Sequence, residues 1–313
     1  MSDEILPTTP PPPPEPILDP SRAPAPPPER LTFFTVVLQF FLIPVGIVAA
    51  CAAIFLGLRA VVGQSKSPDE LLVEVREGGV NRRWQAAFEL SQVLSQPNPP
   101  SVEADFVDKV AAAFQKSSSD DSRIQEYLAL ILGSLRDKRG TPALLVALPG
   151  AGPTLRFNIL MSLGAIGDPA GRTALLDALR DAGDAGVRKV ALFGLSRLPK
   201  EEATLVEVRS HLTDPVVDVK WNAALVLAAF DDPAGADVLA SMLDREALAR
   251  QIPPGEEGEG DAAGMALRNA ISAAARLYQE RFRAPFDDLS KKDKDDKVRE
   301  LAAEALKWLD SRK

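Results

Sequence analysis

The side chains best suited to acid–base or nucleophilic chemistry are scarce in this sequence. It has one histidine, His211, and one cysteine, Cys51. Protein zinc sites use three or four Cys, His or carboxylate ligands, so this pair cannot build one by itself. His211 falls in a predicted helix with Glu207 and Arg209, and no serine or cysteine nucleophile is placed to use it as a base. We therefore interpret His211 as a surface or packed helix residue.

The common catalytic and phosphate-binding motifs are missing from the sequence as well. It contains neither the GxxxxGK[ST] phosphate loop nor the HExxH pair of metalloproteases. The GxSxG nucleophile motif is approached only by GLSRL at residues 194–198, which lacks the second glycine. Acidic residues are abundant, but no two are placed as a general acid and base. The sequence thus predicts a protein that is not an enzyme and has no metal, no cofactor and no small-molecule substrate.

Three large aromatic residues share one place in a repeated pattern and are the candidate partner-binding residues. Trp84, Phe157 and Trp221 each directly follow a basic residue. Equivalent positions elsewhere hold charged or polar residues, so the position tolerates charge. We predict that these aromatic side chains are partly exposed and act as contact anchors for a protein partner. The alternative is that they pack against a neighbouring helix or loop.

The repeated pattern that positions these residues is helical. In three central segments a basic residue is followed seven positions later by leucine: Arg156/Leu163, Arg188/Leu195 and Lys220/Leu227. The same frame extends to residues 83, 125, 268 and 299, and four of the six successive steps are 31 or 32 residues. A near-constant step of this length indicates stacked structural repeats.

Each central unit carries a second apolar helix after the first. Turns with Pro or Gly-Asp-Pro separate the two helices, because proline ends a helix or begins the next one. The pattern predicts an all-α solenoid of about seven helical hairpins over residues 69–313. The predicted second helices are Thr141–Leu148, Ala170–Arg180, Glu202–Leu212 and Pro233–Leu243.

The motif VR-x2-A-x3-L, followed in one unit by GDPA, resembles HEAT repeats of the short kind found in phycobilisome-lyase-like proteins. The resemblance covers roughly residues 69–312 and is clearest over residues 123–243. It implies a stack of helical hairpins whose surface binds other proteins. It does not carry bilin chemistry with it, because one fold serves many activities.

The resemblance also implies a ladder of charged pairs along the stack. In this family an aspartate stands six residues before the basic position. The sequence has that spacing at Asp214/Lys220 and Asp293/Arg299. The two units before Lys220 lack it, so the resemblance implies a broken ladder.

A long apolar stretch lies before the repeats. Residues 31–58 contain no charged side chain over 28 positions, between Arg30 and Arg59. A helix of about 20 apolar residues spans a bilayer core, so we predict one transmembrane helix at residues 31–60. The alternatives are a buried core helix, a cleaved signal peptide and a lipoprotein signal, since Val-Ala-Ala-Cys at residues 48–51 resembles a lipobox that would leave Cys51 acylated.

The remaining segments divide the chain further. Residues 1–30 hold 12 of the 27 prolines and are predicted to be a disordered tail, and residues 61–68 a linker. Residues 251–264, rich in Glu and Gly, are predicted to form a mobile acidic loop in the solenoid. A slight excess of Lys and Arg after the apolar stretch places the solenoid on the cytoplasmic side of the membrane.

The overall charge narrows the choice of partner. The net charge is −8 and the pI about 5.0, which argues against a general nucleic-acid binder. We expect a non-enzymatic, membrane-anchored scaffold that presents a solenoid surface to a protein partner. The alternatives are an accessory or regulatory subunit of a membrane complex such as a transporter and, in another class, a lyase-type enzyme.

Overall fold

The computed structural model describes residues 43–62, 66–119, 121–181, 183–252 and 261–311. The predicted tail, the first twelve residues of the predicted span and most of the predicted acidic loop lie outside these residues. The chain forms two compact units, residues 1–65 and 66–313. Throughout the described residues the regular structure is helical, as predicted.

The first unit contributes one described helix, α2 (Ile43–Val62). Nowhere in the described part of the chain is a helix both long enough and apolar enough to cross a membrane. The transmembrane helix predicted at residues 31–60 is therefore not supported. Cys51 lies exposed on α2.

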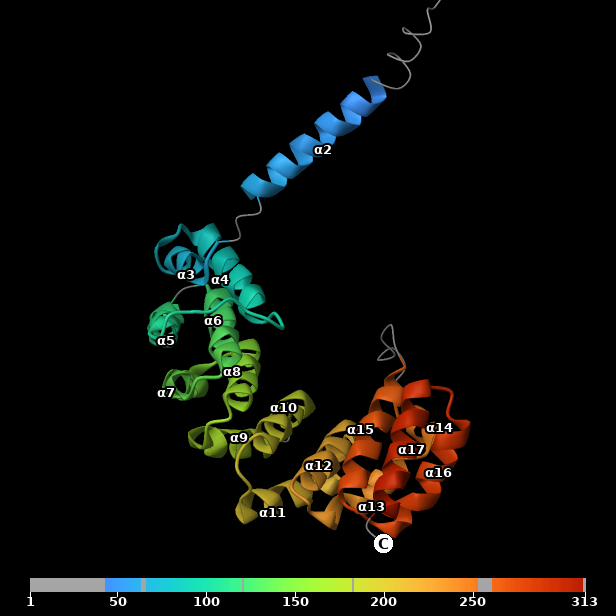
Figure 1. Cartoon of the computed structure of the whole chain (residues 1–313). Helices are drawn as coiled ribbons and strands as arrows, with labels where there is room; N and C mark the ends of the chain where they lie inside the picture. The colour runs from blue at the N-terminus through green and yellow to red at the C-terminus, as the bar shows by residue number, and fades with distance from the viewer. Residues whose placement is uncertain (1–42, 63–65, 120, 182, 253–260, 312–313) are drawn as a thin grey trace, which may run out of the picture. The chain divides into compact units, whose positions relative to one another are not determined.

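The second unit is a stack of helical hairpins in two rows (Figure 1). The helices of the first row are α4 (Val80–Leu94), α6 (Ser122–Leu135), α8 (Pro153–Ile166), α10 (Ala185–Ser196), α12 (Val217–Ala229), α15 (Ala262–Arg276) and α17 (Asp296–Asp310). Those of the second row are α3 (Pro68–Glu77), α5 (Phe106–Lys116), α7 (Thr141–Ala147), α9 (Arg172–Leu179), α11 (Glu202–Ser210), α13 (Ala236–Met242) and α16 (Arg283–Lys292). An extra helix, α14 (Arg245–Ala249), follows α13.

Each first-row helix packs against the next one along the chain, from α4 to α17. Within the described residues each row has seven helices, which agrees with the predicted solenoid of about seven hairpins. In the last repeat Leu306, seven positions after Arg299, is half-buried, but the other five leucines at this position are at most 1% exposed. They are Leu90, Leu132, Leu163, Leu195 and Leu227.

Short turns between the rows repeat one local design. Asp137, Asp168 and Asp232 each accept a hydrogen bond from the backbone N–H two residues later, at 2.9–3.1 Å. Each opens a 3-10 turn that ends in glycine. In the last of them a Cβ on Gly235 would lie 2.8 Å from the Cα of Ala224, so only glycine fits. The turns are η3 (Lys138–Gly140), η5 (Pro169–Gly171) and η7 (Pro233–Gly235).

Small residues let neighbouring first-row helices approach closely. A Cβ on Gly133 would lie 2.8 Å from the Cα of Ser162 on the next helix. A Cβ on Gly164 would lie 2.7 Å from the Cα of Gly194. The spacing of α6, α8 and α10 is thus fixed by backbone-to-backbone contact, which leaves the opposite faces of these helices to carry larger side chains.

Candidate partner-binding face

The three predicted anchor residues occupy three different environments. Trp84 is half-buried against the core, with the Arg123 guanidinium 4.4 Å from its ring centroid. Phe157 is 39% exposed. Trp221 is only 7% exposed and belongs to a buried cluster that includes Leu248 of α14. The expectation of partial exposure is therefore wrong for Trp221, which packs into a cluster of buried side chains from α12 to α17.

A second position of the repeat, which the sequence pattern did not single out, has the more regular apolar character. It lies five residues after the basic position and four after the predicted anchors, so it shares their face of the helix. Six of its seven residues are apolar. They are Phe88, Leu130, Met161, Phe193, Leu225 and Ala273, and the seventh residue is Glu304. We call the six the apolar stripe.

The members of the apolar stripe reach the surface. Phe88 and Phe193 are 40% and 41% exposed, and the other four are half-buried. The ring of Phe88 lies 5.4 Å from that of Tyr127 on the next first-row helix. The guanidinium of Arg197 lies 5.6 Å from the ring centroid of Phe193. Aromatic and cationic side chains thus alternate along this face.

The second row has a different surface. Its exposed large apolar side chains, within the described residues, are the valines Val73, Val146 and Val206. The exposed Phe and Trp side chains of the same residues all lie on the first row: Phe88, Phe157, Phe193 and Trp308. Aromatic residues are enriched at the centres of protein interfaces, so the two rows differ in the feature that marks a binding face.

Two open grooves lie on the first row. One, of about 650 Å³, runs over α4, α6 and α8 and includes Leu130 and Met161 of the apolar stripe. The other, of about 1010 Å³, lies over α15 and α17. In the second groove the rings of Tyr278 and Trp308 are 6.1 Å apart, and Arg276 forms a 2.7 Å ion pair with Asp231.

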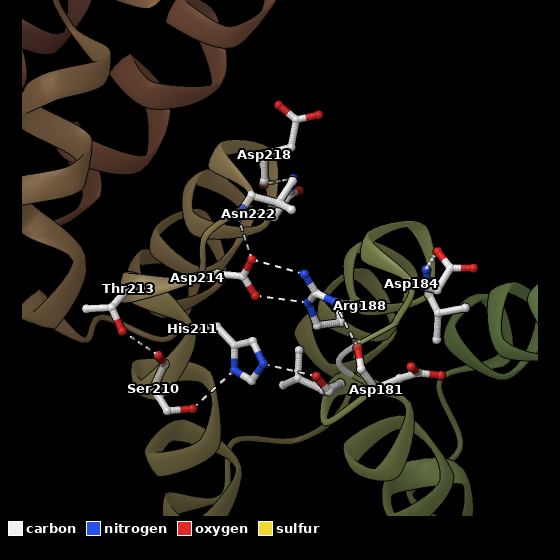
Figure 2. Close-up of polar contacts among 12 residues, drawn as sticks. Asp181, Asp184, Arg188, Ser210, His211, Thr213, Asp214, Asp218 and Asn222 are labelled. Atoms are coloured by element: carbon white, nitrogen blue, oxygen red, sulfur yellow. Dashed lines mark hydrogen bonds and ion pairs between the residues drawn. The ribbon is translucent and has the colours of Figure 1, made fainter. Parts of the chain in front are cut away.

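Charged pairs join successive first-row helices at their N-terminal ends. Arg156 forms a 2.6 Å ion pair with Asp181. Arg188 donates two hydrogen bonds to Asp214, at 2.9 and 3.1 Å, and a third to the carbonyl of Asp181 (Figure 2). In both cases the basic residue of one repeat binds the aspartate that precedes the next first-row helix.

The ladder predicted to be absent from the Arg156 and Arg188 units is present there, whereas Lys220 forms no ion pair within the described residues. Asp181 stands seven rather than six residues before Arg188, and it still pairs with the preceding repeat. The predicted pairing of Asp214 with its own Lys220 does not form, because Arg188 holds the Asp214 carboxylate. The side chains of Arg188 and Asp214 are 6% and 5% exposed, so this is a buried ion pair.

Asp214 is held in its charged form by these contacts. Burial raises the pKa of the Asp214 carboxyl, but the hydrogen bonds from Arg188 and from the backbone N–H of Val216 outweigh it. Its pKa therefore lies below the ordinary value for aspartate.

Arg245, which lies outside the repeat frame, joins the aspartates that precede α15 and α17. Arg245, on α14, donates two 2.7 Å hydrogen bonds to the carboxylate of Asp293 and one of 2.7 Å to Asp261. These two carboxylates hold the pKa of Arg245 above its ordinary value despite desolvation. The predicted partner of Asp293, Arg299, donates instead to its backbone carbonyl at 2.6 Å.

His211 lies among backbone carbonyls rather than in a catalytic arrangement. Its Nε2 is 3.0 Å from the carbonyl oxygen of Leu179, and its Nδ1 is 3.1 Å from that of Glu207. Figure 2 shows Ser210 beside the ring, with its hydroxyl oxygen 3.2 Å from Nδ1. The ring therefore bridges α9 and α11 as a packed residue. Within the described part of the chain, no three His, Cys, Asp or Glu residues are grouped so that they could hold a metal ion.

The comparisons with known proteins agree with this architecture. A family model described as HEAT repeats matches residues 108–196 and 173–252. Residues 108–252 thus match HEAT repeats, and the two-row stack of helical hairpins extends beyond them on both sides. No curated protein matches it in sequence.

Solved structures resemble the chain in fold. The complex of CpcE and CpcF of phycocyanin lyase from Nostoc sp. PCC7120 is 17% identical, with a TM-score of 0.50, over 79% of this chain and 95% of that one. An engineered protein is 18% identical, with a TM-score of 0.42, over 79% and 98%. Human deoxyhypusine hydroxylase is 17% identical, with a TM-score of 0.31, over 82% and 99%.

Proposed function

We propose that this chain is a non-enzymatic scaffold whose first-row helices bind a protein partner. The observation that carries the proposal is the apolar stripe, together with the gathering of exposed Phe and Trp side chains on the first row. Solenoids offer extended surfaces of this kind, and exposed aromatic anchors are frequent hot spots of interfaces. Of the predicted anchors, Phe157 belongs to this surface and Trp84 adjoins it.

The arrangement of the ionisable groups also supports a binding role. The single histidine contacts backbone carbonyls, and the conspicuous Arg–Asp pairs join one repeat to the next. These groups stabilise the stack and are not directed at a shared reaction centre. The likeness to a lyase complex is one of fold, and we do not extend that activity to this chain.

Site-specific crosslinking tests the proposal. A photoreactive amino acid placed at Phe88, Phe157 or Phe193 of the full chain in its host cells is expected to crosslink a discrete partner protein. The matched controls are the exposed second-row residues Val146 and Val206. Equal crosslinking from both rows, or none from the first row, would overturn the proposal.

We further propose that the N-terminal part of the chain attaches this scaffold to a membrane. The support is the uncharged run of residues 31–58, together with the apolar residues Val45, Ile47 and Val48, which are exposed on α2. The full chain is expected to stay in the membrane fraction after alkaline carbonate extraction, and a chain without residues 31–58 is expected to be released. Release of both chains would contradict the attachment.

Two further measurements resolve the details of this attachment. Cys51→Ser separates a lipid anchor from a helix, since only a lipid anchor depends on the thiol. An alkaline phosphatase fusion at the C-terminus is expected to stay inactive if the solenoid is cytoplasmic.

A partner recovered in a fixed stoichiometric membrane complex would favour the alternative role of an accessory subunit.

A further inference from the structure

We propose that the groove over α4, α6 and α8 binds a partner segment in which two or three apolar residues are followed by a carboxylate. This inference rests on the proposed function, because it names the chemistry of a partner at one place on the first row. It depends on three features of the groove: an apolar floor, hydroxyl groups that are already hydrogen-bonded, and one unpaired cation at the edge.

The floor and wall of the groove are apolar. Leu130 and Met161, two members of the apolar stripe, line it together with Leu94. Pro97 and Pro99, in the loop after α4, line it as well. Its volume of about 650 Å³ lies in the range of ligand pockets and is sufficient for a few apolar side chains.

The hydroxyl groups that line the groove already have partners. Ser91 donates to the carbonyl of Phe88 at 2.7 Å, and Ser134 donates to that of Leu130 at 3.0 Å. Ser162 donates to the carbonyl of Ala129 on the neighbouring helix at 2.7 Å. Because these donors are engaged, they do not favour a polar ligand over an apolar one.

Arg136 is the one charged residue among those that line the groove. It is exposed and forms no ion pair within the described part of the chain, while the adjacent Asp137 is held by Arg139 at 2.7 Å. Arg136 follows α6 in the left-handed backbone conformation, with φ of 51°, and its N–H donates to the carbonyl of Gly133. An unpaired guanidinium beside apolar surface favours a carboxylate, which it binds with two parallel hydrogen bonds.

Other unpaired cations follow the first-row helices as well. Lys138 and Arg197 are exposed and form no ion pair within the described residues, and Arg197 also lies at the C-terminal end of a first-row helix. Asp168, after α8, likewise forms no ion pair there, so cations outnumber carboxylates among these unpaired groups at this edge of the stack although the whole chain carries −8. A complementary partner segment is acidic at the end that faces this edge.

The groove favours a peptide segment over a small anion. A phosphate or acetate ion would contact Arg136 and leave the apolar floor uncovered. The groove is open and adjoins the exposed Phe88 at the preceding position of the apolar stripe, so a longer chain can continue along the first row. The occupant that these features fit is a segment of a partner protein in which apolar residues are followed by an acidic one.

Fluorescence anisotropy with the purified full chain tests the inference. The probes are fluorescein-labelled peptides with Leu, Phe, Ile or Met at three central positions, followed by Asp-Glu. Matched peptides end in Asn-Gln or Lys-Lys. We expect the acidic peptides to bind at least about tenfold more tightly than the neutral ones, with the basic peptides weakest.

Substitutions at Arg136 assign this difference to one side chain. Arg136→Asn removes the charge and suits the left-handed backbone, so the acidic and neutral peptides should then bind equally. Arg136→Lys should keep most of the preference, and Arg136→Glu should favour the basic peptides. The matched control Lys138→Asn, at an exposed residue that does not line the groove, should keep it.

Three outcomes would overturn the inference. They are equal binding of acidic and neutral peptides, a preference that survives Arg136→Asn, or no binding of any peptide at millimolar concentration. Circular dichroism of the Arg136 variants verifies that the stack is folded. First-row crosslinking that persists alongside any of these outcomes would leave the proposed function standing, so the two failures are distinguishable.

Discussion

Removing the buried Arg188 side chain should destabilise the stack strongly. Arg188→Met keeps an unbranched apolar stem but deletes the hydrogen bonds to Asp214 and to the carbonyl of Asp181. The Asp214 carboxylate then stays buried with only the N–H of Val216, at 2.8 Å, as a partner. Breaking a buried pair by removing one partner typically costs about 3–5 kcal/mol, and we expect about 3 kcal/mol here.

The partner substitution and the double variant make the prediction quantitative. Asp214→Asn keeps the size of the side chain and an oxygen for the Val216 N–H, so a smaller loss of about 2 kcal/mol is expected. In the double variant neither charge is left alone. Its loss should fall short of the sum of the single losses by roughly 2 kcal/mol, a coupling typical of residues in contact.

Urea unfolding followed by circular dichroism at constant slope measures these losses. Losses that simply add, to within about 0.5 kcal/mol, would refute the reasoning, since they would show that the pair contributes no mutual stabilisation.

Unfolding measured over a series of pH values tests the same pair independently. Because the pKa of Asp214 is lowered in the folded chain, its contribution is present above the ordinary pKa of aspartate, about 3.9, and is lost as the pH falls through the lowered value. Asp214→Asn should therefore lose less stability than the wild type over this acidic range.

Three further predictions follow from the packing. Gly164→Ala should lower the free energy of unfolding by about 1–2 kcal/mol, because the new Cβ meets a backbone atom at 2.7 Å; this cost exceeds the gain of about 1 kcal/mol from the better helix former alanine. Gly150→Ala, with open space around it, should change the free energy of unfolding by less than about 0.5 kcal/mol in the same urea assay. Trp221→Ala should lower the free energy of unfolding by about 3–5 kcal/mol, whereas Phe157→Ala should lower it by under about 1 kcal/mol and reduce partner crosslinking instead. Similar losses of stability at the two sites would contradict the assignment of Phe157 to the surface. Asp168→Ala should cost about 1 kcal/mol by removing the hydrogen bond that opens η5, and an unchanged thermal midpoint would show that the turn does not need it.

The regular parts of the stack were predictable because they depend on local sequence. A basic residue followed seven positions later by leucine returns at steps of 31 or 32 residues, and the structure has a first-row helix at each such place. The positions of the turns could be predicted for the same reason, since proline, aspartate and glycine each favour a turn conformation of the local backbone. The two rows of helices, the number of hairpins and the place of the repeated leucines could therefore be predicted from the sequence.

Burial at the candidate face was not predictable from the repeat frame alone. Phe157 and Trp221 hold the same position in the repeat, yet only Trp221 is buried, in a cluster of side chains from α12 to α17. The repeat frame does not show which neighbours each unit packs against, so periodicity alone could not separate these two residues. The apolar stripe had a readable signal, since six of seven residues at its position are apolar, but the prediction drew on charge tolerance at the position one helical turn earlier.

The charged pairs show a related limit. Asp181 stands one residue away from the spacing typical of the family, and a short turn absorbs that shift without loss of the ion pair with Arg156. Arg245 has no counterpart in the regular frame, and it still forms ion pairs with two aspartates, Asp261 and Asp293. Ion pairs form between side chains that meet in space, so a fixed sequence spacing is neither sufficient nor necessary for them: Asp214 and Lys220 have the spacing and do not pair.

The two ends of several first-row helices carry arginines with different structural roles. Cations near the N-terminal ends, such as Arg156 and Arg188, join each repeat to the next, so replacing one of them weakens the fold. At the C-terminal ends Arg276 pairs with Asp231, but Arg136 and Arg197 make no ion pair within the described residues, so these two can change without that penalty. A lineage that retains this stack can therefore acquire a new partner by substitutions at one edge, while the opposite edge preserves the architecture that displays them.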